Sequence, residues 1–288
     1  MIIVGINGGL GNQMFQYALY LKFKKLGKEA YIDDQILVSK LNNVSSLKIF
    51  DVFDLDYQFC NRKTREKMAD VGMDIFSRAR RKLLGKRHDE DTCFREKDFD
   101  NNYYPEVLEM DDKYLAGCWQ SEKYFEDIKT TIYDNYKFKT DSKDEKLQSI
   151  LKQIRTTNSV ALHIRRGDYV GNTAYEGICT DKYYSDSITY IKQHVDNAKF
   201  FIFSDDIEYA RQRYQGDNFI IVEGFMGDKS HYDMYLMSQC KHNIVANSSF
   251  SWWGAWLNQN KAKFVVSPKK WNNRSELRYT PCDGWIKI

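Results

Sequence analysis

The sequence contains no long hydrophobic run. Among its 288 residues, no apolar stretch approaches the roughly 18 residues that cross a membrane as a helix, so no transmembrane span is predicted. The opening sequence Met-Ile-Ile-Val-Gly-Ile lacks the basic segment and the length of a secretory signal peptide. We therefore expect a cytoplasmic protein that at most touches the inner face of a membrane peripherally.

Cysteine and histidine are sparse and lack metal-site spacing. The six cysteines include no Cys-x-x-Cys pair, and the five histidines are not spaced as metal ligands. This pattern argues against a disulfide framework and a zinc site, and it fits reduced thiols. The Asp-x-Asp sequence at residues 54–56 lies in a poorly patterned segment and is interpreted as chance; that at 89–91 is interpreted as a solvated turn. No metal and no cofactor is predicted.

Charge of one sign is nearly balanced by the other. The chain has 43 Lys and Arg against 40 Asp and Glu, a formal net charge of +3, which is too small to indicate nucleic acid as a partner. With 42% hydrophobic and 29% charged residues, the composition is that of a folded globular protein. The length allows two domains of roughly 150 residues each.

The second half of the chain alternates strands and helices. Apolar strands are predicted at residues 160–164, 200–203, 219–222, 243–246 and 263–266, with helices near 181–195, 207–214, 232–240 and 250–258. Such alternation predicts a parallel sheet with right-handed crossovers, a Rossmann-type domain. The polar segment 139–144 is the best linker candidate.

The first half opens in a similar way. A strand over residues 1–6, a glycine loop over 7–13 and a helix near 14–26 precede a strand at 29–32, and Gly27 is the expected residue after the helix end. A second strand-helix unit is predicted at 114–119 and 122–136. We therefore predict an α/β fold of two facing Rossmann-like domains, residues 1–145 and 146–288, with a cleft between them.

The most informative motif follows a predicted strand. In His163-Ile164-Arg165-Arg166-Gly167-Asp168-Tyr169, two arginines stand where residues 159–162 run into a glycine turn. Ligands of open α/β sheets bind beyond the carboxyl ends of the strands. Paired guanidinium groups there suit an oxyanion such as a diphosphate, because each offers a planar fork of donors. The alternative is that both arginines form surface ion pairs.

Three other strand ends carry polar motifs. Residues 8–13, Gly-Gly-Leu-Gly-Asn-Gln, could bind an anion through backbone amides or form a tight structural turn. Asp205 and Asp206 could accept from a ribose or a guanine edge, whereas Ser204 or Asp205 could cap the next helix. Ser248 and Ser249 can cap a helix and also donate to phosphate. The tryptophans at 252, 253 and 256 are interpreted as core or domain-interface residues.

A basic segment spans residues 62–87. It carries ten Lys and Arg against three acidic residues, with Met68, Phe76, Ala79 and Leu83 among the apolar positions. A basic amphipathic helix of this kind can lie on anionic lipid headgroups. The alternative, which we favour on sequence alone, is a solvated face packed on the domain.

Together, these motifs resemble a known family. The sequences at 8–18, 163–169, 204–206 and 247–254, in this order, resemble the alpha-1,2-fucosyltransferases of glycosyltransferase family 11, as does 119–125 in the bacterial members. The resemblance spans about residues 5–270 and is poor over 40–112. It implies a GT-B architecture whose N-terminal domain receives the acceptor and whose C-terminal domain holds GDP-fucose.

The resemblance also implies roles for individual residues. Arg165 is expected to bind the β-phosphate, supported by Arg166. The remaining donor-binding residues are His163 and Asp205 at the guanosine, with Asp206 beside them, Ser248 and Ser249 at the diphosphate, and Gly9, Gly11 and Asn12 closing from the other domain. GDP-fucose is thus the expected co-substrate, and a galactose-terminated oligosaccharide or glycolipid is the expected acceptor.

The reaction implied is inverting and independent of metal. The leaving GDP gains charge, which Arg165 can stabilise, and inversion further needs a base near the acceptor hydroxyl. Glu176, in the loop after the arginines, and its rival Asp168 are the candidates. Two alternatives stay open: a transferase with another GDP-sugar or another linkage, and a non-catalytic glycan-binding protein.

Overall fold

A computed structural model describes residues 1–34, 48–70, 75–84, 89–97, 102–274 and 280–288. The chain divides into two compact units, Met1–Lys137 and Phe138–Ile288. The segment 139–144 therefore belongs to the second unit, where Asp144 caps helix α7 (Glu145–Thr156) by accepting from the amide of Leu147 at 3.0 Å. The sequence-based boundary after residue 145 falls at the start of this helix.

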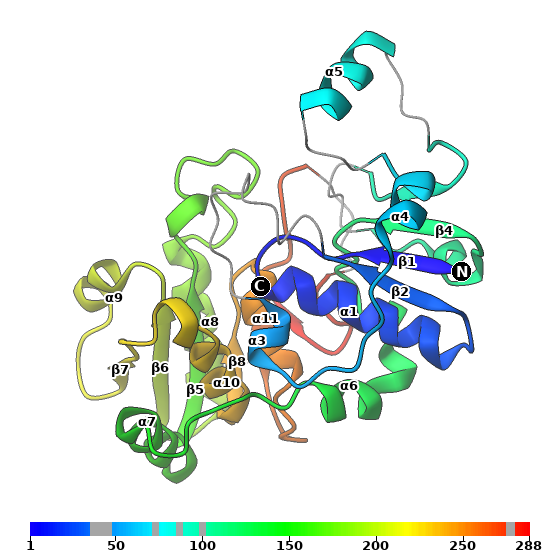
Figure 1. Ribbon diagram of the computed structural model, residues 1–288. Helices are drawn as coiled ribbons and strands as arrows, with labels where there is room; N and C mark the ends of the chain where they lie inside the picture. The colour runs from blue at the N-terminus through cyan, green and yellow to red at the C-terminus, as the bar shows by residue number, and fades with distance from the viewer. Residues whose placement is uncertain (35–47, 71–74, 85–88, 98–101, 275–279) are drawn as a thin grey trace. The chain divides into compact units, whose positions relative to one another are not determined.

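The first unit is built on a four-stranded parallel sheet. Its strands are β1 (Ile2–Gly5), β2 (Ala30–Asp33), β3 (Cys93–Arg95) and β4 (Lys113–Ala116), in the spatial order β2-β1-β4-β3 (Figure 1). Helix α1 (Leu10–Lys25) connects β1 to β2. The shorter helices are α3 (Ile49–Val52), α4 (Arg62–Met68), α5 (Ile75–Leu84) and α6 (Lys129–Asn135), and 3-10 turns lie at Pro105–Glu109, Glu122–Tyr124 and Glu126–Ile128.

Two sequence-based boundaries in this unit are wrong. Helix α1 begins at Leu10 rather than near residue 14, so that Gly11 and Asn12 lie in its first turn and not in a loop. Of the glycines before it, Gly8 takes the left-handed conformation at φ 76°, which explains why the turn itself is so short. The helix predicted at 122–136 is interrupted, because Phe125, whose ring is buried, leaves helical geometry at φ −145°.

The end of α1 is as predicted. Leu26 is its C-cap and Gly27 follows at φ 74°, the conformation that favours glycine after a helix.

The second unit is built on a six-stranded parallel sheet. Its strands are β5 (Asn158–Ile164), β6 (Ala198–Ser204), β7 (Phe219–Ile221), β8 (His242–Ile244), β9 (Val265–Ser267) and β10 (Ile286–Lys287). The helices are α7, α8 (Asp181–His194), α9 (Ile207–Arg213), α10 (His231–Gln239) and α11 (Ser249–Trp256). The five strands and four helices predicted for this half are thereby confirmed, with boundary shifts of a few residues.

The order of these strands places a binding edge. The sheet reads β10-β9-β8-β5-β6-β7, so the chain first builds outward from β5 to β7 and then returns to build β8 to β10 on the other side (Figure 1). The direction in which the chain adds strands to the sheet reverses between β5 and β8, which themselves run parallel. In sheets of this order, ligands bind beyond the carboxyl ends of the strands at the reversal. The loops that follow β5, β6 and β8 are therefore the ones to inspect.

The core of the second unit explains why its strands were predictable. Side chains of β5 and β6 such as Val160, Leu162 and Phe200 are fully buried and pack with α8 and α9, while α7 and α10 contact each other and β5. A strand covered on both faces gives a continuous apolar run. Trp252, Trp253 and Trp256 are buried as well, which confirms their assignment to the core. Two successive units with parallel sheets are the parts of a GT-B chain, and the α/β fold class is confirmed.

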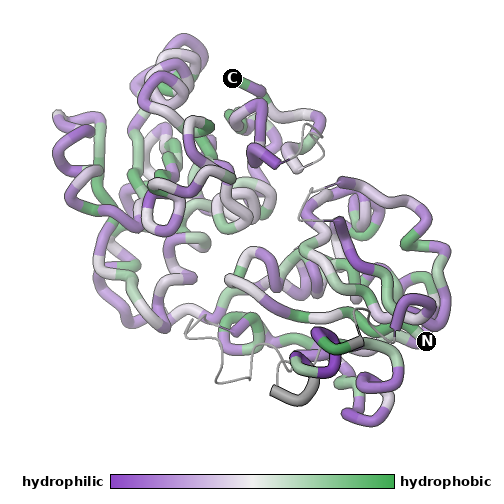
Figure 2. The backbone as a smooth tube through the Cα atoms, turned by 90° about the horizontal axis from the view of Figure 1, so that it is seen from above, coloured by the Kyte–Doolittle hydropathy of each residue, from purple (hydrophilic) through white to green (hydrophobic). Residues whose placement is uncertain are grey.

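Hydropathy along the chain agrees with this construction. Hydrophobic stretches, green in Figure 2, are short and alternate with hydrophilic ones. Within the described residues, no helix combines the length and the apolar character needed to cross a membrane. All six cysteines are present as free thiols, four of them buried.

Candidate active site

Arg165 and Arg166 lie at the carboxyl edge of the second sheet, immediately after β5. Since Ile164 pairs with Ser204, the next residues of β5 and β6 meet side by side. Nη1 of Arg165 lies 2.7 Å from Oδ2 of Asp205, and the amide of Arg166 donates to Oδ1 of Asp205 at 2.8 Å. Nε of Arg166 donates to Oδ2 of Asp206 at 3.0 Å. Each guanidinium is thus held by a carboxylate from the neighbouring strand end.

Gly167 permits this arrangement. A Cβ atom at position 167 would stand 2.7 Å from Oδ2 of Asp205, closer than a Cβ contact allows. The glycine is therefore required by the close approach of the Asp205 carboxylate to the backbone.

Aromatic rings complete the support of the two arginines. The Arg166 guanidinium stacks over the ring of Tyr209 at 3.9 Å, and that of Arg165 lies 5.4 Å from the ring centroid of Tyr169. Arg165 also bonds to Oδ1 of Asp168. Both arginine side chains are about one-third exposed, at 34% each. A guanidinium has five N–H donors. The observed ion pairs use only some of them, and the rest can receive an anion.

The two aspartates after β6 have different roles, which the sequence did not predict: Asp206 caps a helix and Asp205 holds the arginine loop. The N-cap of α9 is Asp206, whose Oδ1 accepts from the amide of Tyr209 at 3.0 Å, and not Ser204 or Asp205 as the sequence suggested. This bond, together with that from Arg166, lowers the pKa of Asp206. Asp205 is thereby left to hold Arg165 and the Arg166 amide.

His163 is the buried titratable group of this edge. It is 6% exposed, and burial lowers its pKa to about 4 against the opposing effect of the Asp205 carboxylate. The ring is therefore neutral at pH 7 and lies 5.9 Å, centroid to centroid, from Phe250. Its Nδ1 has no hydrogen-bond partner among the described residues. Buried polar atoms are normally paired, so a bound ligand or water is the natural partner of this nitrogen.

The loop after β8 contributes the N-terminus of α11. The hydroxyl of Ser248 accepts from the amide of Phe250 at 3.3 Å, so Ser248 caps the helix as predicted, and Ser249 is its first residue. The carbonyl of Asn247 accepts from the hydroxyl of Tyr169 at 3.1 Å. The Arg165 loop and the α11 N-terminus are thus tied together across the reversal between β5 and β8.

Asn273 braces the loop that carries Glu176. Its backbone N–H donates to the carbonyl of Ala174 at 2.7 Å. The side-chain Nδ2 donates to the carbonyls of Thr173 and Glu176, each at 2.9 Å. In the same loop, the ring of Tyr175 stacks on that of Tyr169 at 4.2 Å. Glu176 itself is exposed. Sequence reasoning missed Asn273, because its partners lie 97 and 100 residues away and no local pattern reports such a contact.

At the carboxyl edge of the first sheet, two buried glutamines hold the loops that follow β1 and β4. Nε2 of Gln13 donates to the carbonyl of Gly8 at 2.9 Å, and Nε2 of Gln16 donates to that of Gly117 at 2.8 Å. Both glutamines are fully buried. Gly9 is the N-cap of α1, and Oδ1 of Asn12 accepts from Gln120 at 2.8 Å. The loop after β1 is therefore rigidly joined to the loop after β4. The two glutamines were not among the predicted site residues, although both stand in the motif 8–18.

Metal-binding clusters are not found in the described part of the chain, where no group of three or more His, Cys, Asp or Glu side chains could hold an ion. In the Asp-x-Asp sequence at 54–56, the carbonyl of Asp56 accepts from the hydroxyl of Tyr17 at 2.8 Å.

Comparison with known proteins adds to this geometry. The sequence profile described as glycosyl transferase family 11 matches residues 1–287. The chain is 35% identical over 299 residues to a protein of Escherichia coli named alpha-1,2-colitosyltransferase, covering 100% of this chain and 99% of the relative. It is 30% identical over 311 residues to the O-antigen biosynthesis glycosyltransferase WbnK of Escherichia coli, covering 98% and 99%.

More distant similarity extends to animals and to solved structures. Galactoside 2-alpha-L-fucosyltransferase SEC1 of Bos taurus is 23% identical over 177 residues, which cover 58% of this chain and 48% of that protein. The crystal structure of fucosyltransferase NodZ from Bradyrhizobium aligns with a TM-score of 0.47 and 13% identity, covering 88% of this chain and 91% of that chain.

Proposed function

The chain belongs to glycosyl transferase family 11 and is therefore a glycosyltransferase, and from this premise we propose that it transfers L-fucose from GDP-fucose to the 2-hydroxyl of a terminal galactoside. The observation that carries the proposal is the placement of Arg165 and Arg166 at the strand reversal of the second sheet. The named activity of the distant bovine relative supports the choice of fucose and galactoside.

In the proposed reaction, the arginines act on the leaving group. The bond between carbon 1 of fucose and the β-phosphate oxygen breaks, its electron pair goes to GDP, and the sugar carbon becomes oxocarbenium-like. Negative charge then grows on the β-phosphate, where the free N–H donors of Arg165 and Arg166 stabilise it. We propose that these two guanidinium groups supply the charge without a metal ion.

The carboxylates of the loop keep the arginines in place. Both oxygens of Asp205 are engaged, one by Arg165 and one by the Arg166 amide, which supports a positioning role more directly than the guanosine contact implied by the resemblance. Asp206 holds Arg166 in the same way. The unpartnered Nδ1 of His163 is the better candidate for a contact with the guanosine.

The base is proposed to be Glu176. It takes the proton of the acceptor 2-hydroxyl as that oxygen attacks carbon 1 from the face opposite GDP, which inverts the configuration. Its rival Asp168 is bonded to Arg165, so its carboxylate is already engaged in holding an arginine of the donor site. Ser248 and Ser249 are proposed to meet the diphosphate at the start of α11, and the roles of Gly9, Gly11 and Asn12 stay predictions.

One relative suggests a second candidate for the sugar donor, GDP-colitose. The relative with 35% identity is named for colitose, which is fucose without the 3-hydroxyl. A site that hydrogen-bonds a substrate hydroxyl rejects the analogue lacking it by about 10⁴-fold or more, whereas an apolar pocket rejects an added hydroxyl by only about 10²-fold. The ratio of kcat/KM for the two donors therefore identifies the donor for which the site is built.

One experiment tests the proposal. The protein is incubated with GDP-fucose, GDP-colitose or GDP-mannose, each with galactose-terminated glycans, with and without EDTA, and the linkage of the product is determined by NMR. We expect an α-1,2-fucosyl galactoside that forms equally well in EDTA. A preference for GDP-colitose makes colitose the donor, and loss of activity in EDTA that Mn²⁺ restores contradicts the arginine-only mechanism. Glycan binding with no transfer from any donor would overturn the enzymatic assignment.

A further inference from the structure

Helix α5 of the first unit turns Arg80 and Arg81 toward the protein and exposes the apolar side chain of Leu83. Leu83 is 85% exposed and Ala79, one turn before it, is exposed as well. Arg81, in contrast, has a side chain that is only 19% exposed. A surface helix in water normally buries its apolar side and exposes its cations. The exposed Arg78 and Lys82 fit the solvated charged face favoured on sequence grounds, whereas the exposed Leu83 does not follow from it.

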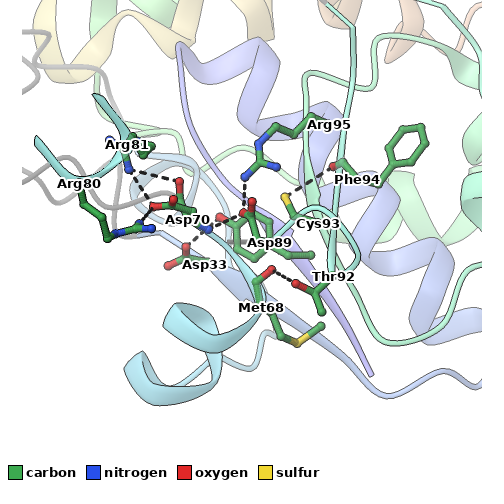
Figure 3. A network of polar contacts seen from close by, with 11 residues as sticks. Asp33, Met68, Asp70, Arg80, Arg81, Asp89, Thr92, Cys93, Phe94 and Arg95 are labelled. Atoms are coloured by element: carbon green, nitrogen blue, oxygen red, sulfur yellow. Dashed lines mark hydrogen bonds and ion pairs between the residues drawn. The ribbon is translucent and has the colours of Figure 1, made fainter. Parts of the chain in front are cut away.

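The inward side is held by a buried carboxylate. Asp70 is 2% exposed and pairs with Nη2 of Arg80 at 2.5 Å and with Nη1 of Arg81 at 2.9 Å, as Figure 3 shows. The amide of Asp70 donates to Oδ2 of Asp89, which also pairs with Arg95 of strand β3. The helix is thus joined through two carboxylates to the edge strand of the sheet.

This anchor fixes the orientation of the helix. Burial would raise the pKa of Asp70, but the hydrogen bonds from Arg80 and Arg81 outweigh it and hold the pKa below its ordinary value. A buried carboxylate that loses its cationic partners is strongly destabilising. Rotation of α5 to hide Leu83 would withdraw both arginines from Asp70, so the outward placement of Leu83 is part of the folded structure.

The outward side combines apolar and cationic side chains. Arg78 and Lys82 are exposed, lie one turn apart beside Ala79 and Leu83, and make no ion pair within the described residues. Lipid interfaces accept such a surface: the apolar side chain enters the boundary between headgroups and acyl chains, and the cations remain at the headgroup phosphates. An anionic bilayer complements both features.

A second copy of the chain fits this side less well. In a two-fold dimer through α5, the same patch meets itself, so Arg78 and Lys82 would face like charges. We infer that the outward side of α5, formed by Arg78, Ala79, Lys82 and Leu83, docks the protein on a membrane surface that contains anionic phospholipid. This inference does not depend on which sugar nucleotide the second unit binds.

Vesicle sedimentation with the full chain tests the inference. We compare vesicles of phosphatidylcholine alone with vesicles that contain about one-third phosphatidylglycerol, at low and high salt. Wild-type protein is expected to sediment with the anionic vesicles alone and to be released by salt. Arg78→Gln with Lys82→Gln should weaken the partition coefficient roughly 30-fold, and Leu83→Ser roughly tenfold.

Matched controls separate docking from general effects. Met226 is 84% exposed, so Met226→Ser removes an equally exposed apolar side chain from the other unit. Lys63→Gln with Lys67→Gln removes two exposed cations from α4. Both controls should bind vesicles like the wild type, and the α5 variants should keep wild-type melting temperatures and turnover on a water-soluble acceptor.

Three results would overturn the inference. The first is equal binding of the wild type and the α5 variants to anionic vesicles. The second is no binding of the wild type to either vesicle. The third is a dimer in light scattering that Leu83→Ser dissociates, without vesicle binding by the wild type, which would assign the surface to a second copy.

Discussion

Oδ2 of Asp205 lies 2.7 Å from Nη1 of Arg165, so the guanidinium at the end of β5 is held by a carboxylate at the end of β6. The two strands pair along seven residues, from Asn158 with Ala198 to Ile164 with Ser204. The direction of the arginine is therefore set by the sheet itself rather than by a flexible loop. This rigidity matters because stabilisation of a developing charge depends on donors that are in place beforehand.

Replacement of Arg165 should nearly abolish transfer. Arg165→Ala is expected to lower kcat by about 10²-fold to 10³-fold, because a donor aimed at the leaving phosphate is lost. Arg165→Lys should recover little, since an ammonium group cannot reproduce the planar fork. Steady-state kinetics measure both effects, and an unchanged melting temperature shows that the fold is intact. Near-wild-type turnover of the alanine variant would contradict the assignment.

Asp205→Asn should affect the donor site through Arg165. The amide cannot form the ion pair, so we expect roughly tenfold weaker GDP binding and a lower kcat. Calorimetric titration with GDP measures the first effect. Asp217→Asn, at an exposed position, is the control for loss of one negative charge and should bind GDP like the wild type. If Asp205→Asn binds GDP normally but discriminates poorly between GDP and ADP, Asp205 contacts the guanosine instead.

Glu176 and Asp168 are distinguished by what their neutral analogues lose. Glu176→Gln is expected to lower kcat with GDP affinity nearly unchanged, as befits a residue that only takes the acceptor proton. Asp168→Asn should instead weaken GDP binding, because Asp168 is bonded to Arg165. If Glu176→Gln turns over like the wild type, the base lies elsewhere.

Asn273→Ala tests whether the brace on the Glu176 loop serves catalysis. The substitution removes both bonds from Nδ2 and keeps the backbone bond to Ala174. We expect a kcat about tenfold lower with nearly unchanged GDP affinity, because a small misplacement of a catalytic group is costly. If kcat falls together with the melting temperature and the pH dependence of kcat is unaltered, Asn273 has a structural role alone.

His163 should make stability depend on pH between about 4 and 6.5. Its pKa is about 4 in the folded chain and 6.5 in a free side chain, so the unfolded state binds a proton in this window that the folded state does not. The free energy of unfolding should therefore fall as the pH is lowered through the window, by about 3 kcal/mol in total. Urea unfolding of the wild type and His163→Gln measures it, and the difference between the two should shrink toward acid. Parallel curves would show that folding does not shift the pKa of His163.

The sequence alone predicted the motifs of the candidate site better than the helices and strands that hold them in place. Strands β5, β6 and β8 contain or lead into buried apolar runs at 160–162, 200–203 and 244–246, so the polar motifs beyond these runs were predictable. Helix α7 was not predicted, although Leu147, Ile150, Leu151 and Ile154 recur at helical spacing and are buried. The short strands β3 and β10 carry too few residues to show a period.

Other features had no local signal at all. The brace by Asn273 and the bond between Asp206 and Arg166 join residues that are 40 to 100 positions apart. The exposure of Leu83 on α5 was not predicted, because periodicity reports which residues share a side of a helix and not which side faces the protein. Only the buried position of Asp70 decides that.

The carboxamide nitrogens of Asn247 and Asn273 have a consequence for how the protein can be made. Each asparagine begins an Asn-x-Ser sequence, the acceptor pattern for N-linked glycans. Nδ2 of Asn247 donates to the carbonyl of Trp271 at 3.0 Å, and Nδ2 of Asn273 holds the Glu176 loop. A glycan replaces one of the two hydrogens of a carboxamide nitrogen, and at Asn273 both hydrogens are used, one for Thr173 and one for Glu176. A glycan on Asn273 and the complete brace of the Glu176 loop are therefore incompatible.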